Sequence, residues 1–182
     1  PGSSIKPLIV YAPALEEGYA SFSSVKDINV DAAKEPKADV ASLPGNWITL
    51  RQAVEKSRNG AAWWLFNEVT PEEGLSYLTQ MQFDKIVPDD YNMAASLGGF
   101  TYGVTAEEMA GAFSALENGG VYREPDCIVR MENLAGEDIY TGREPKEVYS
   151  QQTAAVMVDV MKGVISRGTA RGMGWKSGIE AA

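Results

Sequence analysis

Two residues near the start of the chain have the types and the spacing that nucleophilic catalysis needs. Ser3 and Lys6 stand three positions apart in the stretch PGSSIKPLIVYAPALEEG. On a helix this spacing puts both side chains on one face, with Cβ atoms about 5–6 Å apart, so a lysine amine can reach the serine hydroxyl. A serine hydroxyl is a weak nucleophile, and a neutral lysine can take its proton if burial or nearby positive charge lowers the lysine pKa. An ordinary helix start, with a capping serine and a solvated lysine, has the same pattern.

A second short pattern offers groups that complement such a pair. The stretch SRNG at residues 57–60 predicts a sharp turn between two helices. A turn of this kind can aim Ser57 and Asn59 into one cleft, where the hydroxyl relays a proton between Lys6 and a leaving group and the amide binds a substrate carbonyl. The same residues also suit a plain helix cap, with Arg58 solvated.

The composition narrows the possible chemistry. The chain has no histidine, which excludes Ser-His-Asp and Cys-His catalysis and every histidine-ligated metal site, so a nucleophile needs Lys, Glu, Asp or Tyr as its base. The net charge is −9 and no stretch concentrates Lys and Arg, so we expect no nucleic acid partner. The single cysteine, Cys127, lies in the apolar setting Asp-Cys-Ile-Val and is predicted to be a small buried residue.

Apolar periodicity and capping residues predict a mostly helical chain of one domain. Helices are expected over residues 3–17, 49–56, 61–69, 70–80 and 105–115, and from Ser150 to about 165. Within these helices, Glu72, Glu73, Glu107 and Glu108 are interpreted as first-turn charges. For the adjacent Trp63 and Trp64, we expect one side chain in the core and the other exposed.

The remaining segments predict little regular structure. Residues 19–46 are polar and broken, which favours a long surface loop with short extended pieces. Residues 122–140 are the one convincing strand region, a hairpin with NLAG at its turn. No stretch approaches the roughly 20 apolar residues of a membrane span, and no basic-then-apolar leader precedes Pro1.

Longer stretches around these motifs resemble a known family. PGSSIKPLIVYAPALEEG is similar to the active-site helix of class A, bifunctional penicillin-binding proteins, and QAVEKSRNGAAWWLFNEV to the segment around the second motif of their transpeptidase domain. The likeness continues through SLGGFTYGVTAEEMAGAFSALENGG and YSQQTAAVMVDVMKGVISRGTA. Several ordered motifs at family-like separations are far more specific than Ser-x-x-Lys alone.

The resemblance implies roles for individual residues. Ser3 matches the acylated nucleophile, Lys6 its base, Ser57 the proton-relaying serine and Asn59 the substrate-binding amide. The implied activity is peptidoglycan DD-transpeptidation: the serine attacks the D-Ala-D-Ala bond of a stem peptide, D-Ala leaves, and an amine of a neighbouring stem peptide takes the acyl group. β-Lactams acylate the same serine. No metal or organic cofactor is implied.

The family's third motif, Lys-Thr/Ser-Gly on a strand, is not clearly present. Lys176-Ser177-Gly178 fits the bare pattern, but it follows the GTA run closely and precedes Ile179 and Glu180. We therefore expect the true motif beyond Ala182. The implied fold class is mainly α with a small β-hairpin: residues 1–182 form the helical part of the α/β, β-lactamase-like transpeptidase fold, truncated at both ends, and this fragment alone is expected to be impaired.

The resemblance also implies a setting and leaves two alternatives. The parent protein is expected to be membrane-anchored on the outer face of the bacterial cytoplasmic membrane, whereas the fragment itself has no membrane segment and is expected to be soluble. One alternative is a serine β-lactamase, although no segment looks like a deacylation loop. The other is a non-catalytic binding module of the same fold, which the presence of both short motifs disfavours.

Overall fold

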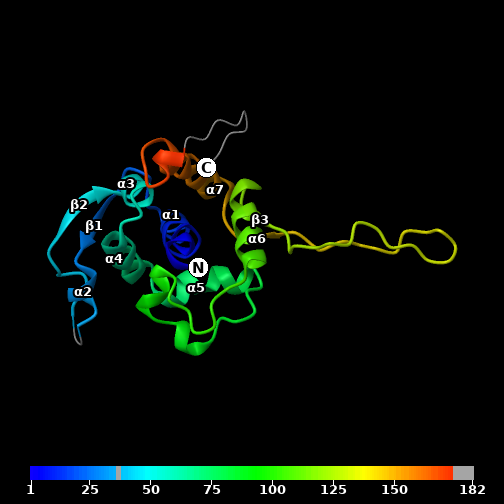
Figure 1. Ribbon diagram of the computed structural model, residues 1–182, viewed down its shortest axis with the longest axis horizontal. Coiled ribbons are helices and arrows are strands. Elements are labelled where there is room, and N and C mark those ends of the chain that lie inside the picture. The colour runs from blue at the N-terminus through cyan, green and yellow to red at the C-terminus, as the bar shows by residue number, and fades with distance from the viewer. Residues whose placement is uncertain (36–37, 174–182) are drawn as a thin grey trace.

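A continuous helical segment, residues 2–16, runs through the centre of the fold, and the other helices surround it (Figure 1). The computed structural model describes residues 1–35 and 38–173. The segment combines a 3-10 turn at Gly2–Ile5, a π-helix at Pro7–Tyr11 and the α-helix α1 at Ala12–Glu16. Its side chains are buried on all sides from Ile5 to Tyr11 except Pro7, as a central helix requires. The helix predicted over 3–17 is confirmed.

Two prolines explain why this helix changes its hydrogen-bond pattern. Pro7 has no N–H to donate to the Ser3 carbonyl. The N–H of Lys6 donates to that carbonyl instead, which tightens the first turn to a 3-10 turn. Further along, the N–H of Ala12 donates to Pro7 O, and Pro13 has none to give. Neither Ala12 nor Pro13 therefore donates to the carbonyl of Leu8.

A tyrosine hydroxyl from a distant part of the chain supplies a donor to that carbonyl. Tyr149 donates to Leu8 O at 2.8 Å, and its ring stacks on Tyr77 with centroids 5.1 Å apart. Tyr149 lies just before α7 (Gln151–Ser166), and Tyr77 lies in α5 (Pro71–Gln80). The contact therefore ties the irregular turn of the central helix to two surrounding helices.

Replacing Tyr149 by phenylalanine is expected to lower the free energy of unfolding by about 1–3 kcal/mol, because the buried Leu8 carbonyl loses its donor while the ring stacking remains. Urea denaturation followed by circular dichroism measures the effect. Tyr102→Phe is the control: Tyr102 is 70% exposed, and we expect a change below about 0.5 kcal/mol. Equal stabilities for the two variants would contradict the role given to this hydrogen bond.

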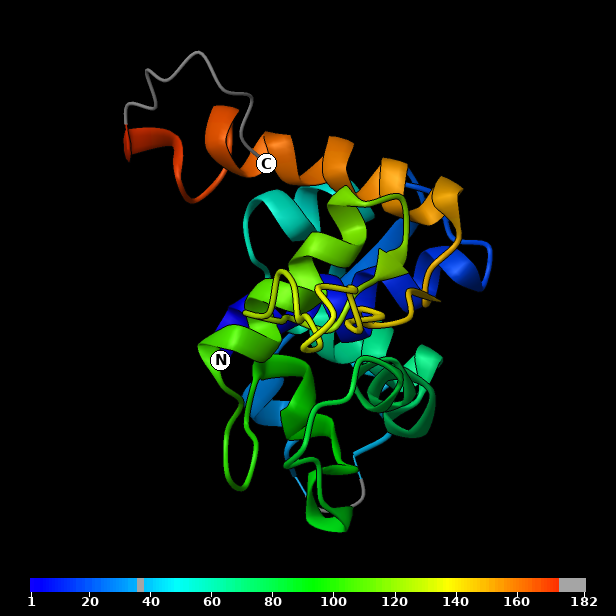
Figure 2. The same cartoon turned by 90° about the vertical axis from the view of Figure 1, so that its right-hand side faces the viewer.

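Four of the helices after the central segment begin at capping residues that the sequence indicated, whereas α4 follows Arg58 without a side-chain cap. Thr49 and Thr105 form capping boxes, and Thr70 and Ser150 accept backbone N–H groups. The helices are α3 (Leu50–Glu55), α4 (Asn59–Val69), α5, α6 (Ala106–Glu117) and α7, with short 3-10 turns at Pro88–Asp90, Met93–Leu97 and Arg171–Met173. The four glutamates interpreted as first-turn charges lie in the first turns of α5 and α6, which confirms that interpretation. In Figure 2, α7 lies across the top of the molecule.

The polar segment 19–46 contains more structure than the sequence indicated. Strand β1 (Ser24–Ile28) pairs antiparallel with β2 (Gly45–Thr49), and a short helix α2 (Val30–Ala33) follows β1. Only Val25 and Ile28 of β1 are buried, so the strand has a weak apolar pattern. The sequence therefore indicates short extended pieces in this segment but not their pairing or the helix.

This strand pair also corrects the expectation for the two adjacent tryptophans. Trp63 and Trp64 in α4 are 6% and 9% exposed, so both are buried. The β1–β2 pair covers α4, and Trp47 of β2 packs edge-on against Trp64 with ring centroids 5.8 Å apart. The expectation of one exposed ring was wrong because it took no account of this cover.

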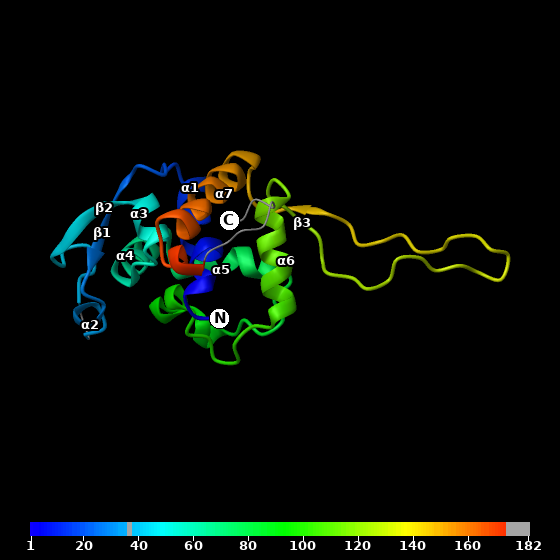
Figure 3. The same ribbon diagram turned by 45° about the horizontal axis from the view of Figure 1, so that its top comes forward.

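The predicted hairpin is an arm that projects from the helices (Figures 1 and 3). Strands β3 (Val121–Tyr122) and β4 (Lys146–Glu147) pair at its base, and the Glu132–Asp138 bridge lies near its tip. The turn falls at 133–136 as predicted, but regular strands do not extend between base and tip.

The arm has no core to pack against, so its apolar side chains face solvent. Val129 is 93% exposed and Leu134 is fully exposed. Cys127 is exposed as well, and the prediction that it is buried was wrong for the same reason. None of the helices in the described part of the chain is long and apolar enough to cross a membrane.

Candidate active site

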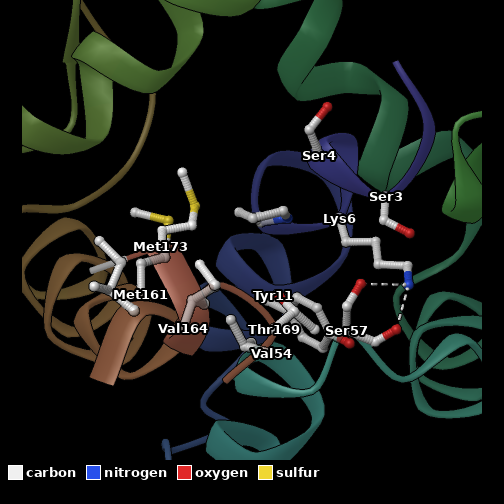
Figure 4. Close-up of a pocket in the computed structure, with 13 residues that line it drawn as sticks. Ser3, Ser4, Lys6, Tyr11, Val54, Ser57, Met161, Val164, Thr169 and Met173 are labelled. Carbon is white, nitrogen blue, oxygen red and sulfur yellow. Dashed lines mark hydrogen bonds between the residues drawn. The ribbon is translucent and has the colours of Figure 1, made fainter. Parts of the chain in front are cut away.

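A cavity of about 500 Å³ opens beside the N-terminal end of the central helix (Figure 4). The central helix contributes the polar side, and α7 with the residues after it contributes an apolar side. The lining residues are Ser3, Ser4, Lys6, Pro7, Tyr11, Val54, Ser57, Met161, Val164, Ile165, Thr169, Ala170 and Met173. The cavity therefore combines the predicted nucleophile, base and relay serine with an apolar wall.

The Lys6 amine is held by the turn that contains the second motif. Lys6 is 1% exposed, and Nζ donates to Asn59 Oδ1 at 2.6 Å, Ser57 O at 3.0 Å and Ser57 Oγ at 3.3 Å. Figure 4 shows the two bonds to Ser57. Burial lowers the pKa of Lys6 from 10.5 to about 8, and the negative charge of Asp27 opposes this decrease. An amine with this pKa is partly neutral near pH 8 and is suited to accept a proton.

Ser3 lies in the first turn of the helix and is exposed to the cavity. Residues three apart in a 3-10 turn lie nearly above one another, and Figure 4 shows the Ser3 hydroxyl on the side of the Lys6 amine. Among the hydrogen bonds of the described residues none joins Ser3 to Lys6. The neighbouring Ser4 hydroxyl donates to Pro1 O at 2.8 Å, so Ser3 is the better candidate for the nucleophile.

The predicted turn between α3 and α4 is present: Ser57 lines the cavity, whereas Asn59 is not among the described lining residues and reaches the site through its hydrogen bond with Lys6. Ser57 has a φ of 50°, a left-handed conformation that is uncommon for a residue with a side chain, and Asn59 is the first residue of α4. Arg58 is solvated as expected, with its side chain 54% exposed, and its guanidinium also forms an ion pair with Asp27 of β1. Sequence reasoning missed Asp27, because nothing in the polar segment around it signals a partner 31 residues away.

The paired glycines at 98 and 99 contribute to the site through backbone contact. Gly98 has a φ of 84°, and a Cβ there would lie 2.4 Å from the N and O atoms of Gly2. The 3-10 turn at Met93–Leu97 therefore ends directly against the residue before Ser3.

Tyr11 is a lining residue that sequence reasoning did not select. It is 1% exposed, its hydroxyl has no partner among the described residues, and burial together with the charge of Asp27 raises its pKa well above 10. A phenol in this state stays protonated and does not compete with Lys6 as the base. The remaining sequence candidate, Lys176-Ser177-Gly178, lies outside the described residues.

The sequence matches the family model described as "Penicillin binding protein transpeptidase domain" over residues 1–182. The chain therefore belongs to the penicillin-binding protein transpeptidase domain family, which confirms the resemblance found in its motifs.

Curated relatives support the same assignment. Penicillin-binding protein 1F of Bacillus subtilis (strain 168) is 36% identical over 173 residues, which covers 93% of this chain and 24% of the relative. Penicillin-binding protein 4 of the same organism is 32% identical, covering 94% and 28%, and penicillin-binding protein 1A of Pseudomonas aeruginosa is 35% identical, covering 85% and 19%. The chain thus spans between 19% and 28% of the length of these relatives.

Solved structures share the fold. The crystal structure of PBPA from Mycobacterium tuberculosis matches with a TM-score of 0.74 at 21% identity and covers 99% of this chain and 46% of that chain. Penicillin-binding protein 1A from Haemophilus influenzae matches with a TM-score of 0.68 at 23% identity, covering 97% and 31%. The imipenem acyl-enzyme complex of PBPA matches at 0.70 and 20% identity, covering 91% and 43%. The fold is that of penicillin-binding transpeptidase domains.

Proposed function

We propose that this chain carries the acyl-transfer site of a peptidoglycan DD-transpeptidase that acts through an acyl-serine intermediate. The main support for the proposal is the buried Lys6 amine, which has a pKa of about 8 and donates hydrogen bonds to Ser57 and Asn59. Ser3 lines the same cavity as Lys6. The substrates are D-Ala-D-Ala stem peptides, and β-lactams acylate the same serine.

The proposed reaction has two acyl transfers. Lys6 in its neutral form takes the Ser3 proton while Oγ attacks the carbonyl of the D-Ala-D-Ala bond, and N–H groups at the helix start stabilise the oxyanion. The C–N bond then breaks, and the proton passes from Lys6 through Ser57 to the departing D-Ala amine. An amine of a second stem peptide attacks the acyl-serine carbonyl and loses a proton to Lys6. The acyl C–Oγ bond then breaks, and Lys6 returns that proton to Oγ, which restores Ser3 and neutral Lys6. Asn59 binds the amide carbonyl of the donor peptide.

The hydrolase alternative requires a base that activates water for deacylation. None of the described residues that line the cavity is an aspartate or a glutamate. The four glutamates noted above stand at helix starts, and Glu108 closes the capping box of Thr105. These positions support transfer over hydrolysis.

We further propose that the 182-residue chain alone reacts slowly with β-lactams. Lys6 is the one cationic residue among the described lining residues, and it serves as the base, so the described cavity has no second cation for the substrate carboxylate. The parent protein is proposed to be membrane-anchored, with this domain on the outer face of the cytoplasmic membrane.

Labelling with a fluorescent penicillin tests both proposals. We expect Ser3 to be the modified residue, identified by peptide mass spectrometry, with no label on Ser3→Ala. Labelling is expected to be slow in this chain and fast in a longer chain of the protein that contains it. A label on another residue in the longer chain would contradict the acyl-serine proposal, and rapid stoichiometric labelling of the 182-residue chain would contradict the second proposal.

A further inference from the structure

Asp27 on β1 is a buried carboxylate with no role in the reaction proposed above. Its side chain is 6% exposed, and Arg58 donates to Oδ2 through Nε at 2.7 Å and pairs with the same oxygen through a terminal nitrogen at 2.5 Å. A carboxylate with two charge-assisted contacts to one guanidinium is held in a fixed orientation. The partner, Arg58, is the middle residue of the Ser-Arg-Asn turn.

The strand β1 contacts this turn on both sides of Asn59. After Asn59 comes Gly60, where a Cβ would lie 2.0 Å from Ile28 O and 2.6 Å from Asp27 Oδ1. The first turn of α4 therefore approaches the strand so closely that only glycine fits at this position. Two contacts therefore hold the turn against β1. Arg58, before Asn59, pairs with Asp27, and Gly60, after Asn59, lies against Asp27 and Ile28.

The position of this turn decides where the Lys6 amine lies. Among the described residues, the three hydrogen-bond acceptors of Lys6 Nζ are Ser57 O, Ser57 Oγ and Asn59 Oδ1. Ser57 has a strained left-handed backbone, which persists only when its surroundings hold it. On the β1 side, the contacts that hold this backbone in place are the Asp27–Arg58 ion pair and the close approach of Gly60 to Ile28.

Among the described residues, the charge that acts on Lys6 is that of Asp27 on β1, and Arg58 of the turn forms an ion pair with Asp27. Tyr11 of the central helix also lines the cavity, but its phenol is protonated and uncharged. The α7 side of the described cavity contributes no ionisable group. Removing Arg58 leaves the negative charge of Asp27 unbalanced and favours the ammonium form of Lys6, whereas removing the charge of Asp27 favours the neutral amine.

We propose that Asp27 is a positioning residue that, through Arg58, fixes the Ser57–Asn59 turn against Lys6 and so places the amine beside Ser3. The geometric part of this inference stands on the structure of the turn. Its consequence for acylation rests on the proposed function.

Titration of Lys6 tests, without any need for activity, whether the charges of Asp27 and Arg58 act on the amine from the fixed positions that the structure gives them. The chain is labelled with [ε-13C]lysine, the Lys6 resonance is assigned by its absence in Lys6→Arg, and its pKa is followed by NMR. Arg58→Gln is expected to lower the neutral fraction of Lys6 at pH 7 several-fold, and Asp27→Asn to raise it. Arg58→Lys keeps a positive charge at this position, so its Lys6 titration is expected to lie close to that of the native protein.

Arg51→Gln is a matched control. It breaks an ion pair of similar geometry, with Arg51 2.5 Å from Asp159, which lies on α7 and does not line the cavity. We expect no change in the Lys6 titration. The inference is overturned if Arg58→Gln and Asp27→Asn both keep a native circular dichroism spectrum and leave the Lys6 titration unchanged, or shift it in the same direction.

Penicillin labelling of a longer chain then tests the consequence. Arg58→Gln is expected to lower the acylation rate constant about tenfold near pH 7, with partial recovery at pH 9, where a larger fraction of Lys6 is neutral in both proteins. A longer chain that is never acylated, combined with opposite shifts of the Lys6 titration, would refute the proposed function and leave the positioning role of Asp27 supported.

Discussion

Replacing Lys6 by methionine is expected to lower the rate of Ser3 acylation by about three orders of magnitude, as the loss of a general base does. Methionine fills a similar volume but provides neither a base for Ser3 nor donors for Ser57 and Asn59. The rate constant of fluorescent-penicillin labelling measures the effect, in a longer chain of the protein if the 182-residue chain reacts slowly. Lys34→Met is the control, because Lys34 is an exposed residue of a surface ion pair and should leave the rate unchanged. Equal rates for Lys6→Met and the native protein would exclude Lys6 as the base.

The native protein should show the titration of Lys6 in the pH dependence of the same reaction. Lys6 accepts a proton only when it is neutral, and its pKa is about 8, so the rate should rise with pH and level off above about 8. Lys6→Met should lose this rise. A native rate that is flat from pH 6 to pH 10 would contradict the assignment.

The second large effect is expected from Gly98→Ala. The new methyl group would overlap the Gly2 backbone at 2.4 Å, so residues 1–3 must move away and carry Ser3 with them. A misplacement of about 1 Å can cost a hundredfold in rate, and we expect a loss of that order in labelling. The positive φ of Gly98 should add about 1–2 kcal/mol of destabilisation.

Gly103→Ala separates the two contributions. Gly103 also has a positive φ, of 73°, but nothing lies within 4 Å of a Cβ placed there. This variant should lose a similar amount of stability in urea denaturation and keep its labelling rate. If both variants label at the native rate, the contact between Gly98 and Gly2 does not position the nucleophile.

The parts of the fold that the sequence predicted are those that local patterns determine. Thr49, Thr105 and Ser150 begin helices because the side-chain oxygen of each accepts the backbone N–H three residues later in the chain. This signal lies within one helical turn. Residue types alone allowed a grouping of Lys6 with Ser57 and Asn59, but a helix cap explained them equally well, since those residues lie more than 50 positions away. The family resemblance favoured the grouping.

The parts that the sequence did not predict depend on contacts between distant segments. Strand β1 has two buried residues, and its pairing with β2 is set by packing on α4, which no local pattern records. The same strand brings Asp27 to Arg58 and closes the cover over Trp64. On the arm, the apolar neighbours of Cys127 suggested that this residue is buried, but the described part of the chain brings no packing surface to it.

The π-helix at Pro7–Tyr11 restricts how the length of this segment can change. One residue more or less turns an α-helix by about 100°, so a deletion between Lys6 and Pro13 would rotate the buried face of α1 away from α5 and α7 or swing Ser3 and Lys6 out of the cavity. Sequence gaps should therefore be absent from this stretch in working homologues. Protein engineers who shuffle or graft this domain should keep the spacing from Ser3 to Pro13 intact and place junctions in the exposed arm instead.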